Sequence, residues 1–487
     1  MDRPLEVLRG AVTAIRARLS AVTCQSERTV MLGAILLVSA VSATTGYILT
    51  QCYAVDVLSS LLYVPEDCWF DQHIHIGRHC FSDYGWVVDA GMRPNPWAYH
   101  VFLPWENHQP FWTGGPAAQM MPQMTFGLLG KWLGAPRLGL IGYLLALAIA
   151  VLAPAVWAAR GARGLERVVV FMALGAAAIP VWAVIDRGNS AGFVVPIGLV
   201  FLVALCRRRW GLVAIMVVLA ALVKPQFPVL VVALLAARQW RWGGLALGGI
   251  VISNIAAYLL WPRDFPETIT QSTHNFFHTV GSLSSSELAW DNNVSFGKAL
   301  LRLPDTVKLY QTGGKLPDGF LAGPRSLIGY AVLVLVVVSV LALGRRIPPV
   351  MVGIVLLATA TLFPPLALWY YLVFVLPVAA LVVRDPDGPP GAGIFDRLAT
   401  HGGRRRAVGI CVSLATALSI AQVAVLSKPF QWQIFGQQGI IGTRTLVATT
   451  VGLAPILWLV ACAVIIVSYA RRPAHSGGSD QGPAREG

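Results

Sequence analysis

The chain has 487 residues, of which 56% are hydrophobic and only 12% charged, and its formal net charge is +14. Soluble domains carry about 25% charged residues, so this composition excludes an ordinary soluble protein and indicates a membrane protein. The excess Lys and Arg residues lie in short connections between apolar runs, which is the pattern of the positive-inside rule. We therefore expect membrane lipids, and no nucleic acid, as partners.

The N-terminal part of the chain predicts an arm, a membrane span and a large loop. Residues 1–29 form a polar, Arg-containing arm that we place in the cytoplasm. The apolar run 30–49 is long enough to cross a hydrocarbon core about 30 Å thick, and without a small-residue cleavage site after it we expect a span rather than a signal peptide. The first extracytoplasmic loop, 52–137, is acidic, and within it segment 117–133 predicts a membrane-surface or re-entrant helix.

The later apolar runs alternate so that every basic cluster falls on the cytoplasmic side. They predict an all-α, polytopic domain over residues 30–470 with about twelve spans, within a range of roughly 11–13. A second large extracytoplasmic loop is expected at 263–325, a cytoplasmic loop at 384–406, and a disordered cytoplasmic tail at 471–487. The spans expected after the first are 138–158, 167–185, 191–206, 210–223, 226–237, 243–261, 326–344, 349–363, 366–383, 407–427 and 447–469.

Ionisable residues stand where two apolar runs meet, at Asp186-Arg187-Gly188-Asn189, and again at Lys224 in the hairpin "AALVKPQFPVL". Charged groups at membrane depth are costly and usually functional. In one interpretation, Arg187 and Lys224 only reach lipid headgroups, or Arg187 pairs with Asp186. In the interpretation that we favour, Arg187, Asn189 and Lys224 hold a phosphate. A phosphate at the membrane surface implies a phospholipid-like substrate.

A carboxylate that could act as a base lies in the first outer loop, in "RHCFSDYGWVVDAGMRPNPW". Transfer of a sugar from a lipid phosphate needs a base near the acceptor hydroxyl and cations that stabilise the leaving phosphate. Asp83 is the first candidate for this base, and Asp71 is the alternative. Hydrolysis by the usual glycosidase route would need two carboxylates.

Cysteine and histidine residues give weaker indications. Cys68 and Cys80 are expected to form a disulfide in the first outer loop, with Cys52 as the alternative partner. His274 and His278 are spaced for one face of a surface helix, and further zinc ligands are not evident near them. We expect neither a metal nor a cofactor.

Several short motifs, in order along residues 80–377, resemble glycosyltransferase family 87. They are C-F-S-D at 80–83, N-P-W at 95–97, the D-R-G-N corner, the V-K-P-x-x-P hairpin, "DNNVSFGKAL" at 291–300 and "LFPPLALWYYLVFVLP" at 362–377. The family's enzymes have the GT-C fold and use polyprenyl-phosphate sugars. The common Tyr-Pro-Pro element after the first loop is reduced here to Gly115-Pro116 and Met121-Pro122.

The resemblance implies a GT-C-like enzyme of the bacterial plasma membrane with its active site outside and both termini inside. It would move mannose, or alternatively arabinofuranose, from a polyprenyl phosphate to an envelope glycan or glycolipid. Asp83 would be the base, Arg187, Asn189 and Lys224 would bind the donor phosphate, and Asn293, Trp369 and Tyr370 would bind sugar or acceptor. The rival hypothesis is a flippase for a lipid-linked sugar that uses the same anion site without a base; transporters often show repeated halves and polar groups near mid-membrane, which this sequence lacks.

Overall fold

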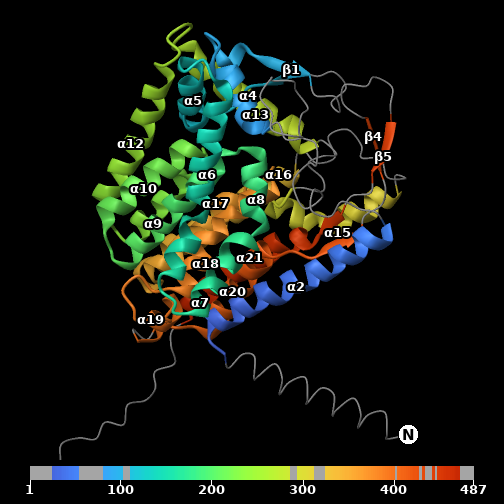
Figure 1. Ribbon diagram of the computed structural model, residues 1–487. Helices are drawn as coiled ribbons and strands as arrows, with labels where there is room; N and C mark the ends of the chain where they lie inside the picture. The colour runs from blue at the N-terminus through green and yellow to red at the C-terminus, as the bar shows by residue number, and fades with distance from the viewer. Residues whose placement is uncertain are drawn as a thin grey trace, which may run out of the picture.

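The structure is a computed structural model of the chain and is mostly α-helical (Figure 1). It describes residues 25–53, 81–102, 110–285, 293–311, 324–400, 403–426, 430–433, 441–444 and 447–471. Asp71, Cys68 and Cys80 lie outside the described residues, so the alternative base and the expected disulfide do too.

The first half of the chain forms the helices that precede and follow the DRGN corner in the sequence. In chain order these are α2 (Glu27–Tyr53), α4 (Ser82–Gly91), η1 (Pro96–Ala98), α5 (Ala117–Trp132), α6 (Pro136–Ala159), α7 (Leu165–Phe171), η2 (Met172–Ala176, a π-helix), α8 (Ile179–Arg187), η3 (Ser190–Phe193), α9 (Val194–Cys206), α10 (Trp210–Val223), η4 (Phe227–Val231) and α11 (Val232–Ala236). Segment 117–133 is a helix as expected, and it packs against α4, α6, α10 and the later helix α12.

The second half contributes the centre of the bundle and part of its rim. Its helices are α12 (Trp240–Tyr258), α13 (Glu267–Ser285), α15 (Phe296–Gln311), α16 (Pro324–Leu343), η5 (Gly344–Arg346), α17 (Pro349–Leu362), η6 (Trp369–Phe374), α18 (Val375–Val383), α19 (Ile394–Thr400), α20 (Arg406–Ile420), η7 (Thr450–Leu453) and α21 (Ala454–Ala470). Every residue of α17 from Val350 to Leu362 is buried, as expected of a helix that is apolar all round.

Four of the described helical segments are long and apolar enough to cross a membrane, or five if the bent pair at 165–187 counts as one span. These segments are Glu27–Tyr53, Pro136–Ala159, Leu327–Arg346 and Thr450–Ala470. The expectation of about twelve spans is not confirmed, because several expected spans fold as shorter helices. For example, α10 has 14 residues, which at 1.5 Å per residue gives about 21 Å rather than 30 Å.

The structure departs from the expected all-α fold in having short β-strands. Strands β1 (His100–Phe102) and β2 (Pro110–Trp112) pair antiparallel, with His100 opposite Trp112. Two more antiparallel pairs follow α20: β3 (Ala424–Leu426) with β6 (Val447–Thr449), and β4 (Phe430–Gln433) with β5 (Ile441–Arg444). The expected spans 407–427 and 447–469 are therefore wrong at their outer ends, since β3 and β6 occupy those residues and α21 begins only at Ala454.

The bundle has two chemically different ends (Figure 1). At one end, which we call the basic end, the start of α2 lies with α7 and α19; at the opposite end, which we call the site end, lie α4, α5 and α13. Three ion pairs join distant segments at the basic end: Glu27–Arg404 at 2.8 Å, Arg28–Glu166 at 2.5 Å and Arg207–Asp387 at 2.7 Å. A fourth, Arg397–Asp387 at 2.7 Å, joins α19 to the loop before it.

Candidate active site

Helix α4 carries Asp83 in its first turn. A carboxylate is favoured there because the helix N-terminus has a partial positive charge. Phe81, just before the helix, has a left-handed backbone with φ of 49°. This turn directs the start of α4 towards the DRGN corner, where both Phe81 and Tyr84 lie against Gly188.

The DRGN corner is a helix end followed directly by a helix start. Gly188 terminates α8 with φ of 63°, a left-handed conformation that glycine adopts without a Cβ penalty. Asn189 then caps η3, its Oδ1 accepting a hydrogen bond from the Ala191 amide at 2.9 Å. The Tyr143 hydroxyl donates to the Gly188 carbonyl at 2.9 Å and fixes the corner against α6.

The corner holds both oxygens of the Asp83 carboxylate. Arg187 Nη2 donates to Asp83 Oδ1 at 2.8 Å, and Asn189 Nδ2 donates to Asp83 Oδ2 at 2.7 Å. The Asp83 side chain is 23% exposed and that of Arg187 12% exposed, so this ion pair is mostly buried but still accessible to solvent. The structure thus joins residues that are 104 positions apart in the sequence.

Lys224 adds a second cation to this site. Helix α10 ends just before it because a residue that precedes proline disfavours the α conformation, and its backbone is extended, with φ of −144° and ψ of 127°. Its side chain is buried, with Nζ 5.4 Å from the centre of the Tyr371 ring. Burial lowers the pKa of Lys224 to about 8, while the nearby Asp83 carboxylate opposes that shift.

Two tyrosines of η6 complete the described wall of the site. Asn189 Nδ2 also donates to the Tyr370 hydroxyl at 3.3 Å, and Tyr371 faces Lys224. Trp369 is buried in the hydrophobic core, and Asn293 pairs with Leu368, directly before η6. Asp83, Arg187, Asn189, Lys224 and Tyr370 therefore converge, whereas Trp369 lies in the hydrophobic core and Asn293 bonds the segment before η6.

The charges around Asp83 set its protonation. Burial disfavours the charged carboxylate, but the Arg187 guanidinium, helped by the Asn189 amide and the Lys224 charge, outweighs that effect and holds the pKa of Asp83 below its ordinary value. Asp83 is therefore ionised at neutral pH. The site offers an anion that can accept a proton and two cations that can bind a phosphate.

Sequence reasoning missed Tyr371 and Tyr143, which support Lys224 and Gly188 respectively. The aromatic run Trp369-Tyr370-Tyr371 was a signal for the first of these, but it did not indicate which of the three rings faces Lys224. Tyr143 lies inside an expected membrane span and carried no signal of its own beyond a polar atom in an apolar run.

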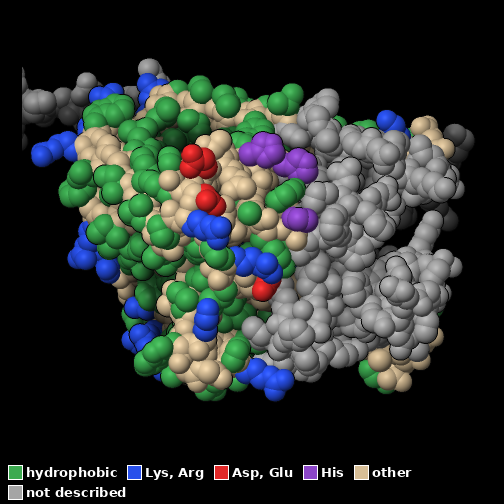
Figure 2. Space-filling view, turned by 90° about the horizontal axis from the view of Figure 1, so that it is seen from above, with side chains coloured by type: hydrophobic (Ala, Val, Ile, Leu, Met, Phe, Trp, Pro, Cys, Tyr) green, Lys and Arg blue, Asp and Glu red, His purple; other side chains and the backbone are tan. Residues whose placement is uncertain are grey.

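The site end also carries the histidines of the described residues, which gather on one face in Figure 2. The rings of His274 and His278 stack with centroids 6.3 Å apart on α13, as their spacing predicted. Within the described residues, His, Cys, Asp and Glu side chains form no group of three that could hold a metal ion. Trp97 from the N-P-W motif is fully buried and donates from Nε1 to the Gly115 carbonyl at 3.0 Å, so it acts in packing.

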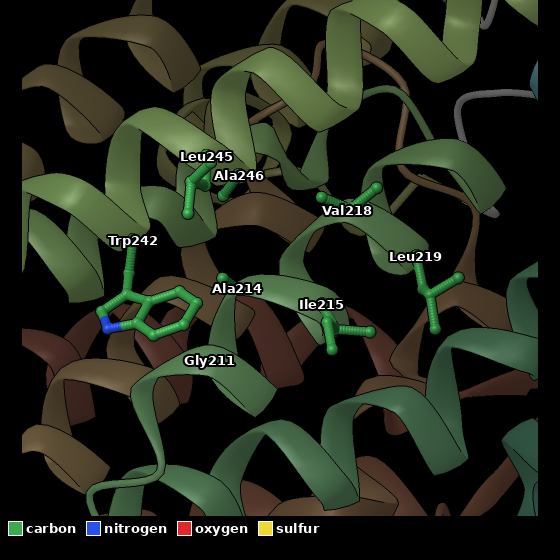
Figure 3. A pocket seen from close by; sticks show the side chains of 8 residues that line it. All are labelled: Gly211, Ala214, Ile215, Val218, Leu219, Trp242, Leu245 and Ala246. Carbon is green, nitrogen blue, oxygen red and sulfur yellow. The ribbon is translucent and has the colours of Figure 1, made fainter.

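An apolar groove of about 350 Å³ lies apart from this site, between α10 and α12 (Figure 3). Its walls include Ile215 and Leu219 from α10 and Trp242 and Leu245 from α12. Ile215 is 55% exposed, whereas Lys224 at the end of the same helix is 3% exposed. The groove and the candidate active site therefore use different faces of α10.

The fold and the site together define a helical membrane protein with a cation-held carboxylate at one end of its bundle. The family model of glycosyltransferase family 87 matches residues 124–365, about half of the chain. The chain belongs to this family and is accordingly a glycosyltransferase. Arg187, Asn189, Lys224 and Asn293 lie inside the matched range, and Asp83 and Tyr370 lie outside it. No curated protein matches the chain.

Proposed function

We propose that this chain transfers a sugar from a polyprenyl-phosphate donor to an extracytoplasmic cell-envelope glycan or glycolipid, with mannose as the first donor sugar to test and arabinofuranose as the second. The observation that carries the proposal is the Asp83 carboxylate held between Arg187 and Asn189, with Lys224 beside it. A single base and a cationic clamp are what transfer from a lipid phosphate requires.

In the proposed reaction, Asp83 takes the proton of the acceptor hydroxyl as its oxygen attacks the anomeric carbon of the donor sugar. A bond forms between that carbon and the acceptor oxygen, and the bond to the phosphate oxygen breaks. The departing polyprenyl phosphate carries the negative charge, which Arg187 and Lys224 stabilise as charge-assisted partners. Asn189 contributes a neutral donor, and Gly188 allows close approach of the corner.

Arg187 has a second part in this proposal. In the donor-free protein it is bonded to Asp83 and keeps that carboxylate weakly basic. A donor phosphate offers Arg187 a more highly charged partner, so its arrival would loosen the Arg187–Asp83 bond and raise the pKa of Asp83. A base acts best when its pKa approaches the working pH. Donor binding would thereby prepare Asp83 for the acceptor.

The location of the site supports a position outside the cytoplasm. Arg404, Arg207 and Arg397 lie at the basic end, and the positive-inside rule assigns such an end to the cytoplasm. The site end would then face outward in the plasma membrane, with the N-terminal arm and C-terminal tail inside. A lipid-linked donor reaches such a site laterally from the outer leaflet.

The test compares three variants of the purified protein with radiolabelled polyprenyl-phosphate mannose, then with the arabinofuranose donor. Asp83→Asn keeps size but cannot accept the proton, so turnover should fall about 10²–10⁴-fold while the donor still binds. Lys224→Ala removes a charge-assisted contact and should weaken donor binding by about 1.5–3 kcal/mol. Asp89→Asn is the matched control, because Asp89 lies on the same helix but pairs with Arg93.

Normal turnover of Asp83→Asn would contradict Asp83 as the base and make Asp71 the next carboxylate to test. The flippase hypothesis makes the opposite prediction for proteoliposomes. There the wild type and Asp83→Asn would move the labelled lipid across the bilayer equally, and no glycoside would form.

A further inference from the structure

Asn293 stands where the described part of the chain resumes before α15. Its side chain orders the turn that leads into α15, because its Oδ1 accepts a hydrogen bond from the Ser295 amide at 2.9 Å. The Ser295 hydroxyl in turn accepts one from the Lys298 amide at 3.2 Å. The first bond follows the usual pattern of an Asx turn, in which the side chain bonds the backbone two residues on, and the second is the bond of a serine N-cap to the third residue of the helix.

The same side chain also bonds a segment more than 70 residues further along the chain. Asn293 Nδ2 donates to the Pro365 carbonyl at 2.8 Å, and its Oδ1 accepts from the Ala367 amide at 3.1 Å. The neighbouring main chain adds a third bond, from the Val294 amide to the Ala367 carbonyl at 2.7 Å. We call these three bonds between 293–294 and 365–367 the loop clamp.

The loop clamp leaves little of Asn293 for a ligand. A side-chain amide has two acceptor positions on oxygen and two hydrogens on nitrogen. Both acceptor positions are used, by Ser295 and Ala367, and one hydrogen is used by Pro365. A direct contact to sugar, which the family resemblance implied, would have a single N–H available.

The clamped segment leads straight into the candidate active site. Leu368 forms an isolated bridge with Asn293, and the Tyr371 amide bonds the Leu368 carbonyl at 2.8 Å, which begins η6. After Trp369 come Tyr370, which accepts a hydrogen bond from Asn189, and Tyr371, which faces Lys224. Asn189 in turn holds Asp83.

We propose that Asn293 is a positioning residue: through the loop clamp it holds the Pro365–Leu368 segment so that Tyr370 meets Asn189 and Tyr371 meets Lys224. The proposal rests on the proposed function for its kinetic consequence but not for its structural one. In this proposal Asn293 does not contact the sugar. It instead connects the second outer loop to the DRGN corner through the hydrogen bonds of the loop clamp.

The decisive variant is Asn293→Ser. A serine hydroxyl can keep the local bond to the Ser295 amide, but it is too short to reach Pro365. This variant therefore distinguishes the effect of the local bond from the effect of the side-chain bonds in the loop clamp. Asn293→Ala removes the bond to the Ser295 amide and both side-chain bonds of the loop clamp, and it leaves the main-chain bond between Val294 and Ala367. Asn254→Ala is the matched control, because the Asn254 amide bonds the Ile250 carbonyl of its own helix at 2.9 Å.

Hydrogen–deuterium exchange in nanodiscs tests the clamp without any substrate. In Asn293→Ser, amides at 366–372 should exchange roughly tenfold faster, as expected when a cross-loop hydrogen bond is lost, and α15 amides should not change. Asn254→Ala should exchange at the wild-type rate at both places. Unchanged exchange at 366–372 in Asn293→Ser would overturn the proposal, whatever reaction the enzyme performs.

A double-mutant cycle with Tyr370→Phe separates positioning from sugar contact. Asn293→Ser should lower turnover roughly 10- to 100-fold, a loss typical of a misplaced catalytic group, and much less in the Tyr370→Phe background. Losses that multiply in the double variant would mean that Asn293 acts independently of Tyr370 and would overturn the proposal. If the wild type transfers no sugar from polyprenyl phosphates, the proposed function fails while the exchange result still decides the role of Asn293.

Discussion

Arg187 is bonded to Asp83 in the donor-free protein, and it is also the side chain best suited to grip a phosphate with two parallel bonds. One guanidinium cannot satisfy both partners fully. On the proposed function, the basicity of Asp83 would therefore depend on whether the donor phosphate is bound, through a single side chain that is 12% exposed.

This coupling predicts the pH dependence of an Arg187→Gln variant. Loss of the guanidinium removes the main attraction that keeps Asp83 ionised, so the pKa of Asp83 should rise. The acid limb of the kcat/KM profile should move to higher pH, with activity lost earlier as pH falls. Arg93→Gln is the control because Arg93 pairs with Asp89, 3.3 Å away on the same helix. An unmoved acid limb in Arg187→Gln would show that another group controls it.

The sequence identified most of these residues but not their pairing. Arg187, Asn189 and Lys224 stood out because polar groups are costly in apolar surroundings, and Asp83 because its loop was expected to lie outside. The alternative in which Arg187 pairs with the adjacent Asp186 was the less favoured interpretation, but the sequence left it open. Only the folded chain brings Arg187 and Asp83 together, because the turn at Phe81 aims α4 at the corner.

The corner between α8 and η3 depends on its glycine for two separate reasons. Gly188 has φ of 63°, and a Cβ added there would lie 3.0 Å from Tyr84 Cβ and 3.3 Å from Phe81 Cβ. The first reason is backbone strain and the second is crowding against α4. Gly134, between α5 and α6, has φ of 65° with no atom within 4 Å of such a Cβ.

Comparison of Gly188→Ala with Gly134→Ala therefore isolates the crowding. Both variants should lose about 1–2 kcal/mol of unfolding free energy from the left-handed backbone. Gly188→Ala should lose more and should also lower turnover, because the added methyl group pushes α4 and Asp83 away from Arg187. Melting temperature in detergent and turnover are the measurements. Equal losses in both, with normal turnover, would mean that α4 yields without consequence for the site.

Elements were predictable where their apolar runs were long and uninterrupted. Helices α2, α6 and α16 follow the expected spans closely, and α5 and α13 were anticipated as non-spanning helices. The expected spans at 210–223 and 226–237 are not confirmed, because these runs fold as helices shorter than the length that transmembrane helices usually have. Strands β3 to β6 were missed because each has only three or four residues, too few to show a period.

At the scale of the whole molecule, the candidate active site and the ion pairs of the basic end occupy opposite ends of the bundle (Figure 1). The charge distribution along the sequence was sufficient to predict that separation, because each basic cluster was assigned to one side. The contacts that close the basic end were not predictable, since Glu27 and Arg404 are 377 residues apart and Arg207 and Asp387 are 180 residues apart.

Cysteine labelling of intact cells tests which end faces outward. Cys52, which is exposed, and Cys68 and Cys80 are first replaced by Ser. A membrane-impermeant maleimide should then label Arg93→Cys, at the site end, and leave Arg209→Cys, beside the Arg207–Asp387 pair, unlabelled until the cells are opened. Labelling of position 209 alone would place Asp83 in the cytoplasm and contradict the proposed donor and acceptor.

The Glu27–Arg404 pair also has a consequence for how the protein is made. Glu27 is buried at the start of α2, the first of the described helices, and its partner is 377 residues further along. At a synthesis rate of about 5–20 residues per second, α2 waits roughly 20–75 s for that partner, and it also waits for α20, against which it packs. A helix from the beginning of the chain is therefore among the last to gain its contacts. A nascent chain that stalls before Arg404 keeps Glu27 without this partner.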